Sequence, residues 1–146
     1  IGNSTNYFNR IFAQATTALY ADVAERFAAD EVLEPGTVVE LGGSAEITKV
    51  STELSDSVFG VISTRAAYLM NSQAGTDQTH PAVAMTGRVP VKVLGTVKKG
   101  DMITTASIAG YGCKALDPKF GTIIGKALED FPSQAKGVIE VVVGRV

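Results

Sequence analysis

The chain has 146 residues, a length typical of a single domain. Hydrophobic residues make up 45% of it and charged residues 19%, which is the opposite of the balance found in intrinsically disordered chains. Thirteen Lys and Arg residues against fifteen Asp and Glu residues give a net charge of −2, so the sequence lacks the basic footprint of a nucleic-acid-binding protein. The single Cys excludes an internal disulfide framework and a zinc site of clustered cysteines.

Residues 9–27 are rich in Ala, contain no Gly or Pro, and leave two structures open. Apolar residues recur at helical spacing at Ile11, Ala15, Ala18, Leu19, Val23 and Phe27. Thr16, Thr17 and the neighbouring aromatic residues favour an extended strand instead. We therefore expect residues 1–30 to form an extended or helical N-terminal arm. Its apolar side chains are too many for a free arm, so the arm should pack on another surface.

Residues 31–146 have the pattern of a β domain. Glu34-Pro35-Gly36 predicts a turn, because Pro sets φ at its second position and Gly accepts a positive φ at its third. Many short strands separated by Gly-rich turns predict a mainly β fold, a compact antiparallel barrel or sandwich. The predicted strands are Thr37–Leu41, Ala45–Val50, Val58–Thr64, Ala82–Thr86, Val89–Leu94, Met102–Thr105, Thr122–Leu128 and Val138–Val146.

A weak internal repeat links two parts of this domain. In each part a turn Gly precedes a strand, Gly36 in the first and Gly100 in the second, and a later apolar strand is interrupted by Gly60 or Gly125. The interrupting Gly indicates a bulge or a close backbone approach. We expect each unit to contain a turn, a strand, a hairpin and a Gly-kinked strand, and the two units to close on each other as a barrel. Chance similarity between β-rich segments is the alternative.

The least regular stretch lies between the units. Residues 71–80 are small or polar apart from Ala74, which predicts a surface loop on a rigid β scaffold. Ser72, Asp77 and His80 provide the residue types of an acyl-transfer triad within this loop. Because no Gly-x-Ser-x-Gly turn surrounds any Ser, a solvated loop is the preferred interpretation.

Three further groups of residues have types or spacings that occur in catalytic, phosphate-binding or calcium sites. Cys113 stands beside Lys114, whose charge could activate a thiol, but a lone Cys is usually a small buried residue. The glycine-rich run at 41–44 has no following Lys-Ser/Thr pair, so it predicts no phosphate loop. An acidic stretch lacks calcium-loop spacing and is expected to be a solvated face; it comprises Asp22, Glu25, Asp30, Glu31 and Glu34. We predict no catalytic, cofactor or metal site.

Several segments resemble structural and fibre proteins of tailed bacteriophages. Residues 1–13 resemble the fibre-type segment that precedes terminal domains of phage tail fibres. The resemblance continues through residues 20–27, 34–39, 59–64, 67–71 and 87–93, and so covers nearly the whole chain. Members of this group are similar to the autoproteolytic intramolecular-chaperone domain of phage neck appendages, in which a C-terminal β domain helps a trimeric fibre assemble and is then cut away.

This resemblance implies a virion protein, a homotrimer and self-cleavage. The cleavage residues of that family do not map onto this chain, so we carry over no catalytic position and do not expect an enzyme. The chain does not begin with Met, which agrees with a processed fibre piece or with a cloned fragment.

The leading expectation is a distal tail-fibre or appendage module in the virion. Phe8, Ile11, Phe12 and Leu19 of the arm would hold three copies together. Other virion proteins would be partners, and the loop Asn71–Thr79 would contact a host receptor. The alternatives are a self-cleaving chaperone domain and a capsid-decorating or cement protein. No cofactor and no nucleic-acid partner are expected. Membrane insertion is not expected either, because no apolar run approaches the roughly 20 residues that span a bilayer.

Overall fold

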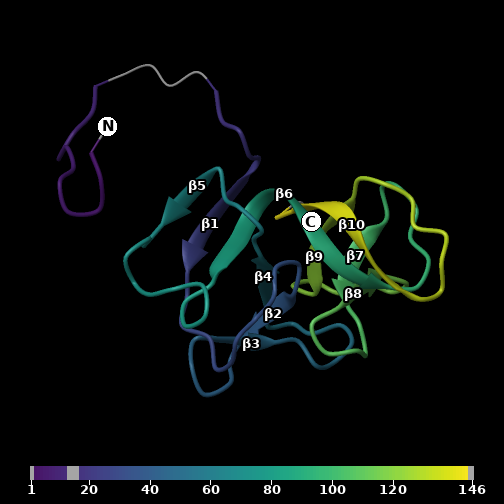
Figure 1. Cartoon of the computed structure of the whole chain (residues 1–146). Helices are drawn as coiled ribbons and strands as arrows, with labels where there is room; N and C mark the ends of the chain where they lie inside the picture. Colours follow the sequence, from purple (N-terminus) through teal and green to yellow (C-terminus); the bar gives the residue numbers. More distant parts are fainter. Residues whose placement is uncertain (1, 13–16, 145–146) are drawn as a thin grey trace.

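The computed structural model describes residues 2–12 and 17–144, and in this part of the chain every regular element is a β-strand. The strands form two lobes that share the long central strand β6 (Figure 1). The strands are β1 (Asp22–Arg26), β2 (Val38–Leu41), β3 (Ile47–Lys49), β4 (Val58–Ile62), β5 (Tyr68–Met70), β6 (Ala82–Leu94), β7 (Met102–Thr105), β8 (Gly112–Lys114), β9 (Ile123–Ala127) and β10 (Lys136–Val143). The predicted mainly β fold is confirmed.

The second lobe is a closed five-stranded barrel. Its pairings run from β6 to β8, β7, β9 and β10 and return to β6, so the ring has no free edge. β6 and β10 pair from Gly87↔Val143 to Leu94↔Lys136. Buried and partly exposed residues alternate along both of these strands, which places one apolar face inside the barrel. The fold is therefore a barrel and not a sandwich.

The first lobe is a second ring built from β1, β2, β3, β4 and the first half of β6. β1 and β4 both pair antiparallel with β6, and β2 joins β4 to β3. The ring closes through one parallel bridge, Ala29↔Ile47, just after the end of β1. Its interior is filled by a cluster that includes an edge-to-face contact between Phe27 and Phe59, with ring centroids 5.0 Å apart.

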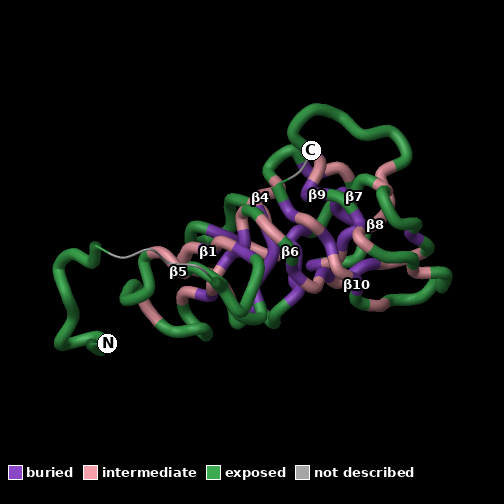
Figure 2. Tube along the Cα trace, turned by 90° about the horizontal axis from the view of Figure 1, so that it is seen from above, coloured by how far each residue is buried: buried purple, intermediate pink, exposed green. Residues whose placement is uncertain are grey.

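Two apolar clusters fill the interior, and the larger one extends from the second lobe into strands of the first. In β2, Val39 packs in the interior of the first lobe, whereas Val38 belongs to the cluster that also fills the second lobe. In β4, Ile62 likewise packs in the interior of the first lobe, whereas Val61 belongs to the cluster that also fills the second lobe. In each of these strands two adjacent residues, Val38–Val39 and Val61–Ile62, are therefore buried on opposite faces. The buried residues gather around β6 (Figure 2).

The predicted internal repeat is confirmed at the level of strand pairing. β2 pairs with β3 on one side and β4 on the other, and β7 pairs in the same way with β8 and β9. Gly60 lies opposite Val39 and Gly125 opposite Ile103, and each pairing register shifts at the next residue. A side chain on Gly60 would meet the Ala84 carbonyl oxygen at 2.5 Å, so this Gly marks the close approach that the sequence predicted.

The way in which the repeats close differs from the prediction. We expected the two units to close on each other as one barrel, and this was wrong. Each unit instead closes a ring of its own with flanking strands, and β6 supplies a strand to both rings. The parallel contact that seals the first ring, Ala29↔Ile47, has a counterpart in Val93↔Gly112 of the second. The repeated unit is therefore a complete five-stranded ring, whereas the prediction was a turn, a strand, a hairpin and a Gly-kinked strand.

Other elements depart from the predicted strands. Ala82–Thr86 and Val89–Leu94 are one strand, because Gly87 adopts a φ of +106° and lets the chain pass close to β1 without a break. β5 and β8 were not predicted, since each has only three residues. Of the alternatives left open for residues 9–27, the strand is correct at β1. Ala15 and Thr16 lie outside the described residues.

The arm is separate from both rings. β1 lies inside the segment 1–30 assigned to the arm, but it pairs with β6 along its whole length, so the arm ends at Ala21. Residues 2–12 are exposed throughout (Figure 2), and the Ser4 carbonyl oxygen accepts a hydrogen bond from Gln73 of the first lobe at 3.2 Å. Near its start, Asn3 accepts hydrogen bonds from the backbone amides of Thr5 and Asn6 and forms a local turn.

Gly125→Ala is expected to lower the free energy of unfolding by about 1–3 kcal/mol, because the added methyl group would collide with the Val142 carbonyl oxygen on β10. Urea unfolding would measure the change. Lys126→Ala, at an exposed position of the same strand, serves as the control and should stay within about 0.5 kcal/mol of the wild type. Equal stabilities of the two variants would show that Gly125 is not constrained by its neighbour.

Candidate functional site

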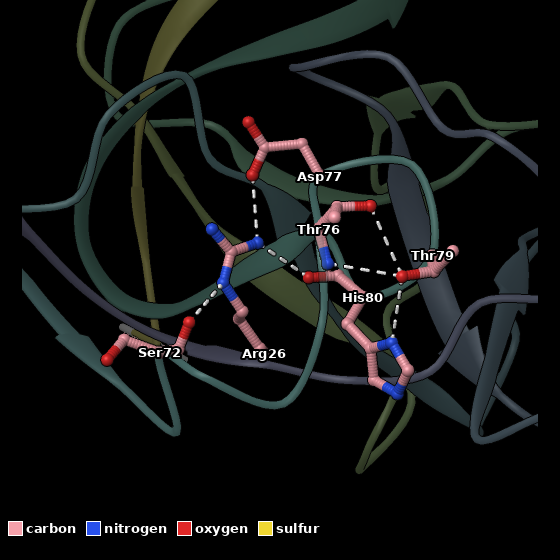
Figure 3. A network of polar contacts seen from close by, with 6 residues as sticks. All are labelled: Arg26, Ser72, Thr76, Asp77, Thr79 and His80. Atoms are coloured by element: carbon pink, nitrogen blue, oxygen red, sulfur yellow. Dashed lines mark hydrogen bonds and ion pairs between the residues drawn. The ribbon is translucent and has the colours of Figure 1, made fainter. Parts of the chain in front are cut away.

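The loop between β5 and β6 is held in a fixed shape by Arg26. This arginine, at the end of β1, donates hydrogen bonds from Nη1 to the Asp77 carboxylate at 2.8 Å and to the His80 carbonyl oxygen at 2.7 Å. Its Nε donates to the Ser72 carbonyl oxygen at 3.2 Å (Figure 3). One largely buried guanidinium group therefore ties together both ends of residues 71–80, which we call the insertion loop.

Contacts inside the insertion loop reinforce this shape. The Thr79 hydroxyl accepts a hydrogen bond from the Thr76 backbone amide and lies 3.1 Å from Nδ1 of His80 (Figure 3). The His80 ring packs so closely on Gly75 that a side chain at that position would collide with it. Asn71 adopts a φ of +52°, a conformation that Asn tolerates better than most residues. The loop is exposed but well ordered by its own contacts.

The structure brings Ser72, Asp77 and His80 together, but not as a triad. Asp77 pairs with Arg26, the His80 ring contacts Thr79, and Ser72 contributes its carbonyl oxygen to the same arginine. These contacts position a loop and give none of the three side chains a role in activating another. The arginine that organises the loop was missed from the sequence, because β1 lies far from the loop along the chain.

A cleft of about 510 Å³ lies between the insertion loop and the turn at residues 31–35. Apolar residues form much of its lining, among them Leu33, Ile62 and Leu69. Charged groups stand at its rim: Arg26, Glu34, Arg65 and Asp77. The Glu34 carboxylate accepts a hydrogen bond from Lys92 at 2.6 Å, which lowers the pKa of Glu34. A cleft of this volume with a partly apolar lining is typical of small-molecule sites.

A second cleft, of about 530 Å³, adjoins the first, and both are lined by residues 63–65. Asp22 is buried at its base and accepts a hydrogen bond from the Ser63 hydroxyl at 2.6 Å. Arg65 donates a hydrogen bond to the Tyr20 hydroxyl at 3.0 Å, and Oε2 of Glu140 is buried without a partner among the described residues. Residues 63–65 line both clefts, and we call the two clefts together the groove; its lining includes residues 32–35 in the first cleft and Leu19 and Tyr20, at the root of the arm, in the second.

Cys113, the acidic stretch and the glycine-rich run lie in environments that explain their roles in the fold. Burial raises the pKa of the Cys113 thiol, and Lys114 beside it pairs with Asp101 at 3.2 Å. In the acidic stretch, Glu31 pairs with Lys49 at 2.6 Å. The glycine-rich run at 41–44 is the turn between β2 and β3. Across residues 2–12 and 17–144, no three His, Cys, Asp or Glu residues gather as metal ligands, and no helix is suited to crossing a membrane.

Two solved structures are similar to this chain in fold. The pre-mature form of gene product 12 of bacteriophage phi29 matches over 94% of this chain, with a TM-score of 0.70 and 19% identity. A C-terminal fragment of the same phage protein matches over 84% of this chain, with a TM-score of 0.60 and 19% identity. No family model and no curated protein matches the sequence.

The matched region differs in size between the two structures. This chain spans 24% of the length of the pre-mature protein but 99% of the C-terminal fragment. The two-lobed fold described above is thus similar to the fold of that fragment over nearly its entire length.

Arg26→Leu is expected to loosen the insertion loop and to lower the free energy of unfolding by about 1–3 kcal/mol, because carbonyl oxygens at both ends of the loop lose their donor. Limited proteolysis within residues 71–80, together with urea unfolding, would measure both effects. Asp77→Asn removes only an exposed ion-pair partner and should cost less than about 1 kcal/mol. Unchanged cleavage of the loop in Arg26→Leu would show that Arg26 does not hold it.

Proposed function

We propose that this chain is a structural module of a tailed-bacteriophage virion, the distal part of a tail fibre or appendage. The observation that carries the proposal is the match to the C-terminal fragment of phi29 gene product 12, which spans nearly all of that fragment and includes both lobes.

The proposed role of the arm is to hold three copies in register. Tyr7, Phe8, Ile11 and Phe12 each keep at least three fifths of their surface exposed, and Leu19 is also exposed. A row of exposed apolar side chains is costly in water and is relieved by association. Closed cyclic symmetry would bury these side chains and leave no unpaired association surface on the assembly.

The proposed role of the insertion loop is to contact the host surface. The second lobe connects β9 to β10 through residues 128–135, whereas the first lobe connects the equivalent strands through residues 63–81. The longer connection carries β5 and the insertion loop, which ring closure does not require. A loop that is exposed and yet fixed by Arg26 loses little conformational entropy on binding.

The double variant Ile11→Asp and Phe12→Asp is expected to be folded but monomeric, because two charges on the arm cannot be buried against other copies. Sedimentation velocity would give the assembly state, and circular dichroism the β content. Leu116→Asp with Phe120→Asp is the matched control, since these two residues are equally exposed but lie between β8 and β9. If the double arm variant is still trimeric, the arm is not the contact that holds the three copies together.

Replacing residues 71–79 by a short Gly-Ser linker, in an Arg26→Leu chain, is expected to abolish most binding of the labelled trimer to host cells. Arg26→Leu is included so that no buried guanidinium group is left without partners. The Arg26→Leu chain with its loop intact is the control for the loss of the clamp. Undiminished cell binding by a trimeric, loop-deleted chain would place host contact elsewhere.

A further inference from the structure

A trimer held by the arm needs a surface that receives the arm. Around a three-fold axis, the patches that two neighbouring copies present to each other are different. An arm therefore either meets its two sister arms at the axis or lies on another part of a neighbouring copy. The inference that follows rests on the proposed trimer and concerns the choice between these two arrangements.

The arm has the chemistry of a segment that binds in an apolar groove. Phe12 is 92% exposed and Ile11 is 68% exposed, and two aromatic residues precede them. Arg10 is the only charged residue among residues 1–12. Such a segment loses exposed apolar surface on docking and brings only one charge that must be accommodated.

The groove offers a complementary surface. The first cleft has an apolar lining that includes Leu33, Ile62 and Leu69, and its volume is sufficient for more than one large side chain. The carboxylates of Glu34 and Asp77 stand at its rim, and each side chain keeps about three quarters of its surface exposed. Each carboxylate already pairs with one cation, Glu34 with Lys92 and Asp77 with Arg26. A carboxylate has acceptor sites for a further donor, which Arg10 would supply while the neighbouring apolar side chains cover the floor.

The position of the arm also favours the groove. The root of the arm lines the second cleft through Leu19 and Tyr20, and residues 63–65 line both this cleft and the first. Gln73 of the insertion loop donates a hydrogen bond to the carbonyl oxygen of Ser4 at 3.2 Å, so the start of the arm borders the same lobe. From Leu19 to Phe12 an extended chain spans up to roughly 24 Å, so the apolar tip of the arm is not restricted to the surface beside its root.

We propose that residues 7–12 of each copy lie in the groove of a neighbouring copy, with aromatic side chains over the floor formed by Leu33, Ile62 and Leu69. The insertion loop and its Arg26 clamp then form one wall of a subunit contact. This assigns the groove to a second copy of the chain and leaves the outer surface of the insertion loop free for the host.

Disulfide cross-linking between two differently tagged chains tests this arrangement. In a Cys113→Ser background, one chain carries Phe12→Cys and the other carries Ala66→Cys, a substitution at a half-buried residue that lines the first cleft. Co-expression followed by mild oxidation is expected to give a disulfide-linked pair that contains both tags. Gln134→Cys, exposed in the loop between β9 and β10, replaces Ala66→Cys in the control and should give no mixed pair.

The possible results separate this inference from the trimer itself. A wild-type trimer in which Phe12→Cys chains link only to one another would place the arms together at the axis and overturn the inference. An intrachain link in the double variant Phe12→Cys and Ala66→Cys, without mixed pairs, would place each arm in its own groove and also overturn it. A wild-type monomer in sedimentation velocity would instead refute the proposed trimer. Dissociation of the trimer by Leu69→Asp would support the inference independently.

Discussion

The sharing of β6 between two rings is the constraint on which the structure depends. The first half of this strand pairs with β1 and β4, and its second half pairs with β10 and β8. Neither ring can close without it. Gly87 stands where the strand passes from one ring to the other, at a positive φ and too close to β1 for a side chain. One of the two apolar clusters extends across both lobes, so the lobes pack together as a single unit.

Sharing a strand also determines which surfaces are left for function. β2 and β4 are covered on one face by their own ring and on the other by the second lobe, so they contribute few groups to the outside. The groups available for binding lie in the connections, above all residues 63–81. Because ring closure does not use these residues, they can be elaborated without cost to the core. The clamp by Arg26 then supplies the rigidity that a long connection would otherwise lack.

The features that the sequence predicted correctly are those set by local chemistry. Gly60 and Gly125 indicated close backbone approaches, and both glycines lie against a neighbouring carbonyl oxygen. Most strands were found because apolar runs ended at Gly-rich turns. The ring closure was mispredicted because it depends on pairing between β6 and four strands distant in the sequence, which no local pattern encodes. The three residues of β8 were too few for such a pattern. The internal repeat also appears as a recurring three-residue sequence, since Gly87-Arg88-Val89 recurs as Gly144-Arg145-Val146.

The same distinction applies to the site. Ser72, Asp77 and His80 could be noticed as a group because they are close in sequence, whereas Arg26, which gives them a common role, lies on β1. The groove is equally non-local, since its lining comes from the turn before β2, the end of β4 and the insertion loop. Two nearly equivalent rings differ mainly in the length of one connection. Function is best sought where that symmetry is broken, because the shared core explains the residues common to both rings but not the additional ones in residues 63–81.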